Sequence, residues 1–357
     1  MNKFNSTIAI ALLALSFTAC KKNTDEPIVV VPPSDGNTLT LNGLIGAELG
    51  SAAGNSVYVD FSTDKQTAIE RDSWDLGFYS GTDFKVILNS TNGASAVVTD
   101  KTDLNAVTAT GFDSSVLKVG QGSGNFSIVD DGREANILNK TAIATISATD
   151  AENKVYIVNR KGGSANVLAN DELYKIRVIR KGNGYTLQYA KLTETTFKTL
   201  DITKNTEANF QFASLVKGTA VTAEPAKASW DIVWGYSMYW TSTFPYAFSD
   251  LVFINSLGGT TASAFSTSKK SYAAFTESDL SSVTFSSSRD VIGANWRLTQ
   301  PVTTNGITTP IGVKSDIFFL VKDASGNIYK LKFNSFISND GGTRGKPVIE
   351  YKLVKKG

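Results

Sequence analysis

The chain contains a long-range internal repeat, and this repeat limits the possible folds more than any other feature. The motif SWDLGF at 73–78 returns as SWDIVW at 229–234, an offset of 156 residues. The motif LYKIRV at 173–178 returns as IYKLKF at 328–333, an offset of 155 residues. Coincidence between common strand patterns is the alternative, but it does not readily produce two long and nearly equal offsets. We therefore expect tandem copies of one unit.

The copies define the predicted domain organisation. We expect a first β domain at 38–205 and a second at 206–357, joined near residues 200–208. Trp74 and Trp230, which occupy the same place in the two copies, are predicted to be equivalent core residues. Each copy also ends in a tyrosine-containing strand pattern.

Short alternating patterns separated by turn residues indicate strands throughout both copies. Two hairpins are predicted: one around Asn183-Gly184, because both residues tolerate positive φ, and one around DASGN at 323–327. Apolar residues make up 41% of the 357-residue chain, which is enough for a buried core. The predicted fold class is all-β, with two tandem antiparallel domains.

The composition excludes several kinds of chemistry. The chain has no histidine and one cysteine, so a Ser-His-Asp triad, histidine-ligated metal, Fe–S clusters and intrachain disulfides are excluded. The formal charge of +2 gives no electrostatic reason to expect a nucleic-acid partner. Asp75 and Asp231 follow the repeated tryptophans, and we interpret them as strand-end residues that bond backbone rather than as paired catalytic carboxylates.

The N-terminus has the order of a secretory signal. Lys3 precedes an apolar run at 8–17, and small residues then lead to Cys20. A lone cysteine in this place is similar to a bacterial lipoprotein signal, in which Cys20 is lipidated and becomes the first mature residue. An ordinary cleaved signal with a chance cysteine is the alternative. Residues 1–20 are thus the predicted signal peptide, and the Pro-containing segment 21–37 is the predicted tether.

The most unusual internal segment runs from Trp230 to Phe248 and is rich in aromatic residues. On a regular strand, alternate positions from Trp230 to Trp240 would share one face. The first part of that face is consistent with a core strand. From Gly235 onward, aromatic residues alternate with Ser and Thr, which favours a platform for a flat ligand. The candidate binding residues here are Trp234, Tyr236, Met238, Tyr239 and Trp240.

Several motifs of the second half resemble the HmuY family of haem-binding lipoproteins. They are FQFASLVKGTAV, SWDIVWGY, DIFFLVKDASGNIYKLKFNSF and VIEYKLV, which together span residues 209–355. The first half is similar through YVDFSTDKQT, SWDLGF, VYIVNRKG and LYKIRV. The resemblance implies an all-β protein anchored to the outer membrane. It also implies haem scavenging without catalysis, with transfer of haem to an outer-membrane transporter.

This chain departs from the family pattern at the haem iron. The family's best-known ligands are two histidines, one of them five residues after the Trp of the WD motif; Tyr79 and Gly235 occupy that position here. Met238 is the only methionine after Met1 and is a candidate iron ligand, although methionine also fills apolar space. Tyr79 is a second candidate, because a phenolate can bind ferric haem.

The predicted function is therefore a lipid-anchored, non-enzymatic binding protein of the cell envelope, with haem or another tetrapyrrole as its ligand. A surface module that binds glycan or protein through the aromatic segment is the alternative. The predicted location is the outer membrane, and exposure at the cell surface is one arrangement open to a lipid-anchored protein there.

Overall fold

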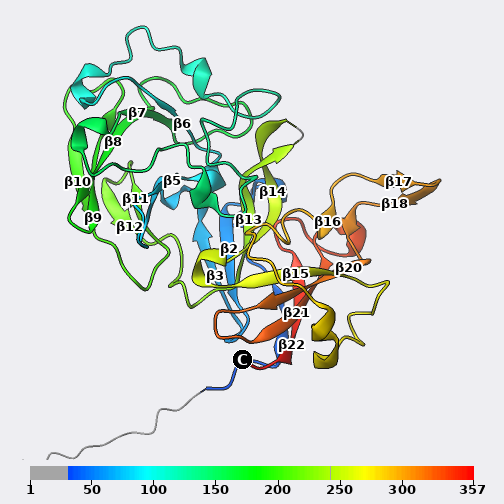
Figure 1. Cartoon of the computed structure of the whole chain (residues 1–357). Coiled ribbons are helices and arrows are strands. Elements are labelled where there is room, and N and C mark those ends of the chain that lie inside the picture. Colours follow the sequence, from blue (N-terminus) through cyan, green and yellow to red (C-terminus); the bar gives the residue numbers. More distant parts are fainter. Residues whose placement is uncertain (1–30, 242) are drawn as a thin grey trace, which may run out of the picture. The chain divides into compact units, whose positions relative to one another are not determined.

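The structure is a computed structural model that describes residues 31–241 and 243–357. The predicted signal peptide, Cys20 and most of the tether lie outside the described residues. Every strand pair in the four large sheets is antiparallel, so the all-β prediction is confirmed (Figure 1). None of the helices in the described ranges is long and apolar enough to cross a membrane.

The first of two β-sandwiches packs a sheet of order β10-β9-β8-β7-β6 on a sheet of order β12-β11-β4-β5. Its core contains side chains of both sheets, and the rings of Phe78 and Tyr185 meet across it with centroids 5.3 Å apart. The strands are β4 (Leu76–Tyr79), β5 (Val86–Leu88), β6 (Ser95–Val98), β7 (Tyr156–Asn159), β8 (Tyr174–Lys181), β9 (Gly184–Lys191), β10 (Lys198–Ile202), β11 (Phe210–Ser214) and β12 (Thr219–Val221).

The second sandwich packs a sheet of order β1-β22-β21-β20-β15 on a sheet of order β14-β13-β2-β3. Its core also joins both sheets, and the rings of Phe61 and Tyr351 lie 4.5 Å apart. The strands are β1 (Gly36–Thr40), β2 (Asn55–Asp60), β3 (Lys65–Glu70), β13 (Ile232–Thr241), β14 (Phe244–Ile254), β15 (Thr261–Ser266), β20 (Ile317–Lys322), β21 (Ile328–Ser335) and β22 (Val348–Lys355).

Shorter elements connect these sheets. Two small hairpins belong to the second half, formed by β16 (Arg297–Leu298) with β19 (Gly312–Val313) and by β17 (Val302–Thr304) with β18 (Ile307–Thr309). The helical elements described are short 3-10 helices of three to six residues: η1 (Gly50–Ala52), η2 (Arg71–Ser73), η3 (Ser90–Asn92), η4 (Leu104–Ala106), η5 (Ser114–Leu117), η6 (Ile137–Asn139), η7 (Asp150–Glu152), η8 (Ser256–Gly258), η9 (Glu277–Ser282) and η10 (Ser338–Asp340).

Both predicted hairpins form, with one correction. Lys181 pairs with Gly184, so the two-residue turn between β8 and β9 is Gly182-Asn183 rather than Asn183-Gly184. Gly182 takes the positive φ of 55° that the tight turn requires, and Gly184 belongs to the strand. Between β20 and β21, the Asp323 carboxylate accepts the backbone N–H of Asn327 at 2.8 Å and closes the second turn.

The two repeats exchange their hairpins. The hairpin β2–β3 comes from the first repeat, but β2 pairs with β13, the strand that follows Trp230. The hairpin β11–β12 comes from the second repeat, but β11 pairs with β4, the strand that follows Trp74. As a result, the strands of the first sandwich, β4 to β12, follow one another without interruption in the sequence. The first sandwich is thus inserted in the sequence between strands β3 and β13 of the second sandwich. Two sheets therefore contain strands from both sides of the predicted boundary at residues 205/206. The division into 38–205 and 206–357 stays a prediction, and it describes the two sequence repeats.

Equivalent contacts hold both exchanged strands. The Asp231 carboxylate accepts the backbone N–H of Phe61 at 2.8 Å, and the Asp75 carboxylate accepts that of Leu215 at 2.7 Å. Both carboxylates thus bond the backbone just beyond the exchanged strand, in agreement with the strand-end interpretation. Trp74 and Trp230, each 7% exposed, are equivalent and buried as predicted.

Candidate functional site

The six predicted binding residues do not form one site, and an irregularity in β13–β14 contributes to their separation. The pairing shifts between Gly235 and Ser237, where Ser249 and Asp250 of β14 lie opposite the single residue Tyr236. Asp250 takes a φ of 62° at this bulge and is fully buried, with its carboxylate paired to Arg344 at 2.9 Å. A bulge increases the local twist and redirects side chains.

Trp234 faces the core of the second sandwich. Its side chain is 0% exposed and belongs to the same buried cluster as Val57 of β2 and Tyr351 of β22. The indole lies so near Gly43 that a Cβ added there would be 2.2 Å from the ring. This packing is that of a structural residue, and it leaves no room for a ligand against the indole.

Met238 is buried in a different cluster. Its side chain is 2% exposed and packs with Val119, Ile128, Val129 and Ala247. Three of these residues belong to the segment 118–129, which covers the thioether. Met238 can therefore reach a ligand only if that segment moves away.

Tyr239 and Trp240 lie together near the end of the β13–β14 hairpin. Their ring centroids are 3.8 Å apart, and the ring of Phe248 lies 5.6 Å from that of Tyr239. The Tyr239 hydroxyl donates to the Asp290 carboxylate at 3.0 Å, whereas Trp240 is half-buried. These rings form an aromatic surface separate from Met238.

Tyr79 belongs to the first sandwich. It is half-buried, and its ring lies 5.8 Å from that of Phe210, the residue paired with it in the exchanged strand β11. Its backbone carbonyl accepts the hydroxyl of Tyr185 at 2.8 Å. The structure does not bring Tyr79 together with Met238.

Tyr236 is the predicted residue that lines an open cleft, which we name the Tyr236 cleft. Its volume of about 470 Å³ is within the range of small-molecule sites, ~300–1,000 Å³. The Tyr236 hydroxyl lies beside Gly163, since a Cβ added to Gly163 would be 3.3 Å from the hydroxyl oxygen. Burial raises the pKa of Tyr236, with Ser164 and Arg71 acting in the opposite direction. The cleft is lined by Ile45, Ser51, Ala52, Gly54, Glu70, Arg71, Asp72, Asn92, Lys161, Gly162, Ser164 and Tyr236.

Arg71 fixes one side of this cleft. Its guanidinium carbon lies 4.6 Å from the centre of the Tyr236 ring, a cation–π distance. The same guanidinium donates to the backbone carbonyl oxygens of Ala53, at 2.8 Å, and of Thr91. Arg71 therefore joins the end of β3 to η3 and holds the Tyr236 ring in place.

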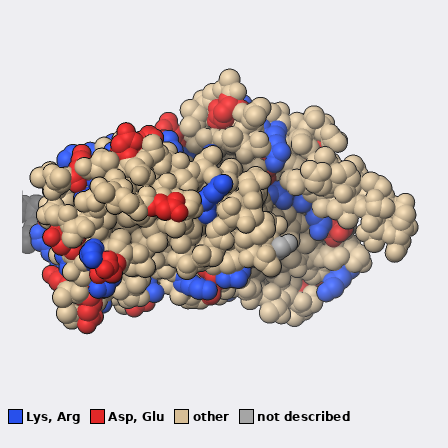
Figure 2. Space-filling model, turned by 90° about the horizontal axis from the view of Figure 1, so that it is seen from above, with Lys and Arg blue, Asp and Glu red and all other residues tan. Residues whose placement is uncertain are grey.

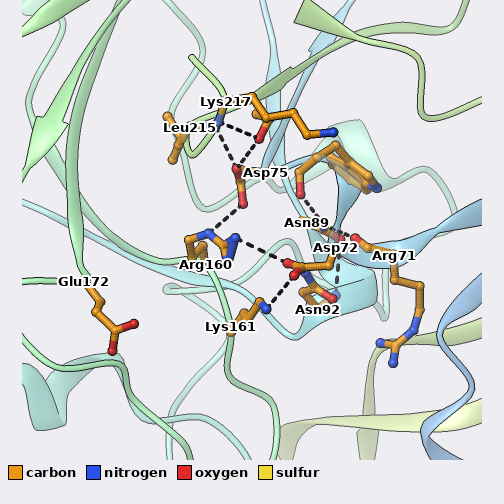
Figure 3. A network of polar contacts seen from close by, with 12 residues as sticks. Arg71, Asp72, Asp75, Asn89, Asn92, Arg160, Lys161, Glu172, Leu215 and Lys217 are labelled. Carbon is orange, nitrogen blue, oxygen red and sulfur yellow. Dashed lines mark hydrogen bonds and ion pairs between the residues drawn. The ribbon is translucent and has the colours of Figure 1, made fainter. Parts of the chain in front are cut away.

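An ion-pair network supports the opposite side (Figure 3). The Asp72 carboxylate pairs with Lys161 and, at 3.3 Å, with Arg160. Arg160 also pairs with Asp75 at 3.2 Å, so the network reaches the residue that holds the exchanged strand β11. Burial raises the pKa of Asp75, and Arg160 opposes this effect. The loop that carries Lys161 is thereby attached to the first WD motif.

Sequence reasoning missed Arg71, Lys161 and Ser164. Arg71 and Ser164 lie in connecting segments without periodicity or motif, and Lys161 lies near the end of the motif VYIVNRKG, which indicates the family but not a binding role. Only the fold brings these residues to Tyr236. On the face of the molecule shown in Figure 2, Lys, Arg, Asp and Glu are scattered among uncharged residues.

Comparison with known proteins decides the family. A family model described as HmuY protein matches residues 52–351, most of the chain. The chain belongs to the HmuY family. The match covers both repeats, in agreement with the resemblance of motifs in the second half and in the first. HmuY is a family of binding proteins of the cell envelope known for haem binding. Neither a curated protein nor a solved structure matches the chain.

Proposed function

We propose that this HmuY-family protein is a non-catalytic, lipid-anchored binding protein that captures haem or a related tetrapyrrole at the outer membrane. Family membership, together with the Tyr236 cleft, is the observation that carries the proposal. Haem is cargo in this role, to be passed to an outer-membrane transporter.

The Tyr236 cleft offers an axial donor and positive charge to a haem ligand. A tyrosine oxygen is a known axial donor to ferric haem, and Tyr236 supplies one beside a cleft of suitable size. Lys161, whose side chain is 45% exposed, and Arg71 place positive charge near the carboxylates that a haem carries. Because burial raises the pKa of Tyr236, haem iron must displace the phenol proton on binding.

Haemin titration, followed through the visible spectrum, tests this site. The parent is expected to shift the Soret band, and Tyr236→Phe is expected to lower haemin affinity by about tenfold while keeping the ring. Met238→Leu is the matched control, because it keeps the apolar volume of a buried side chain. If Met238→Leu changes the spectrum and Tyr236→Phe does not, then Met238 is the ligand and segment 118–129 opens. A parent without any Soret shift contradicts haem binding.

The lipid anchor has its own test. We propose that Cys20 carries the lipid, on the grounds of the signal-like sequence before it. A Cys20→Ser protein is expected to leave the membrane fraction, measured by fractionation and immunoblotting against the parent. Retention of this variant in the membrane would contradict the proposal.

The aromatic end of β13–β14 favours a second candidate function, glycan or protein binding. Trp240, Tyr246 and Phe248 are all half-buried there, and the rings of Tyr246 and Phe248 lie 5.8 Å apart. Exposed aromatic faces are suited to sugar or protein partners. Trp240→Ala separates the two functions, since it removes one ring of this surface and Trp240 does not line the Tyr236 cleft.

A further inference from the structure

A second cavity lies where the two WD motifs meet, and the proposed haem site does not use it. Its volume is about 130 Å³, close to the ~150 Å³ of a cavity known to hold benzene. Both Trp74 and Trp230 line it, so each repeat supplies an equivalent wall. None of the six predicted binding residues lines this cavity.

Aromatic rings make up much of its wall. Tyr58 meets Trp230 edge-to-face with ring centroids 5.0 Å apart. Trp74 meets Phe212 in the same way at 4.8 Å. These pairs correspond, because Tyr58 of β2 and Phe212 of β11 lie in the two exchanged hairpins. Ring faces of Trp and Tyr attract cations.

Glu224 places a carboxylate at the Tyr58–Trp230 end of the cavity. Its Oε1 accepts the side-chain N–H of Asn209 at 2.9 Å. The Tyr58 hydroxyl donates to the carbonyl oxygen of the preceding residue, Ala223, at 3.1 Å, which fixes the ring beside Glu224. None of the ion pairs formed within 31–241 and 243–357 involves Glu224.

Two other charged groups, Asp130 and Arg289, line the cavity, and neither forms an ion pair within 31–241 and 243–357. Burial raises the pKa of Asp130 to about 7, and Arg289 opposes the shift. Asp130 also accepts the backbone N–H groups of Leu88, at 2.7 Å, and of Ala142, at 3.0 Å. Glu224 is the carboxylate at the aromatic end of the cavity, and Arg289 is not among the groups that shift its pKa. Its side chain is largely buried, and a carboxylate withdrawn from water is costly unless it is paired or protonated.

We propose that this cavity binds a small organic cation, of about the size of tetramethylammonium, with Glu224 as counter-ion and the Tyr58 and Trp230 rings as an aromatic cage. The cavity volume restricts the ligand to a compact ammonium compound. Haem is far larger, so this site is independent of the proposed function.

The protonation of Glu224 predicts how the affinity of the site for a cation depends on pH. Burial raises the pKa of Glu224 to about 8, with Asn209 and Trp230 acting in the opposite direction. Tyr58 also faces it, and burial raises the pKa of that phenol well above its usual value, so Tyr58 stays neutral. Below pH 8 the cation must therefore displace the carboxyl proton. Affinity is expected to rise with pH up to about 8 and then to level off, with a proton released on binding below that pH.

Calorimetric titration with tetramethylammonium chloride, against sodium chloride of equal ionic strength, tests the proposal. The parent should bind saturably, and Glu224→Gln should weaken binding by at least about tenfold. Glu207→Gln is the matched control, because Glu207 is an exposed carboxylate in the same part of the chain and lines neither this cavity nor the Tyr236 cleft. Thermal melting checks that both variants fold.

The heat of binding to the parent should differ between two buffers of different ionisation enthalpy, because each buffer takes up the proton that is released on binding. Absence of saturable binding at pH 8, or equal binding by Glu224→Gln, would overturn the proposal.

Discussion

Deleting residues 33–70 is expected to unfold the second sandwich while the first sandwich stays folded. The deleted segment contains β1, which pairs along its length with β22, and β2, which pairs with β13. It also contains Val57, Val59 and Phe61, which are fully buried in the core of the second sandwich. Without them, one face of that core is open to water and two sheets lose strands, so the loss far exceeds the ~5–15 kcal/mol that stabilises a domain.

Limited proteolysis with mass spectrometry measures this outcome. Fragments protected in the truncated chain should come from 71–229, whereas 230–357 should be digested. The matched control is the fragment 71–229, which contains every strand of the first sandwich and should melt cooperatively alone. Protection of 230–357 after the deletion would show that the strand exchange is dispensable.

Trp234→Ala is expected to destabilise the protein by ~3–5 kcal/mol, the largest effect among the predicted binding residues. The indole is 0% exposed, and Gly43 lies directly against its ring. Removing it leaves a large cavity between β-sheets that cannot readily collapse. Denaturant unfolding measures the change.

Trp240→Ala is the control within the same strand. Its ring is half-buried at the end of the hairpin, so we expect a loss of about 1 kcal/mol or less. Equal effects for the two substitutions would show that Trp234 is not the core residue the structure indicates.

Local patterns predicted much of the fold because they record which face of a strand is buried. Alternation and turn residues revealed the all-β class, and the repeated WD motif revealed that Trp74 and Trp230 are equivalent. No local pattern specifies the partner of a strand. The hairpin β2–β3 has the same alternation whether it pairs within its own repeat or with β13, and so the exchange was not predicted.

The candidate site was predicted less well, for a related reason. Regular alternation placed Trp234, Tyr236, Met238 and Trp240 on one face. With the bulge opposite Tyr236 and the twist of the hairpin, these side chains enter three separate clusters. The bulge depends on Asp250, whose carboxylate pairs with Arg344, 94 residues away. Such a long-range contact leaves no signal in the alternation of β13.

The reciprocal hairpin exchange has the form of a domain swap between two molecules, but here one polypeptide carries both partners. Covalent connection through residues 203–209 gives each hairpin a high effective concentration, on the order of millimolar, at the strand that it completes. A swapped dimer would dissociate on dilution and would expose its unpaired β-strand edges to other chains. Because both exchanges are intramolecular here, the completed sheets persist at any dilution, including the sparse copy numbers of a protein on a cell envelope.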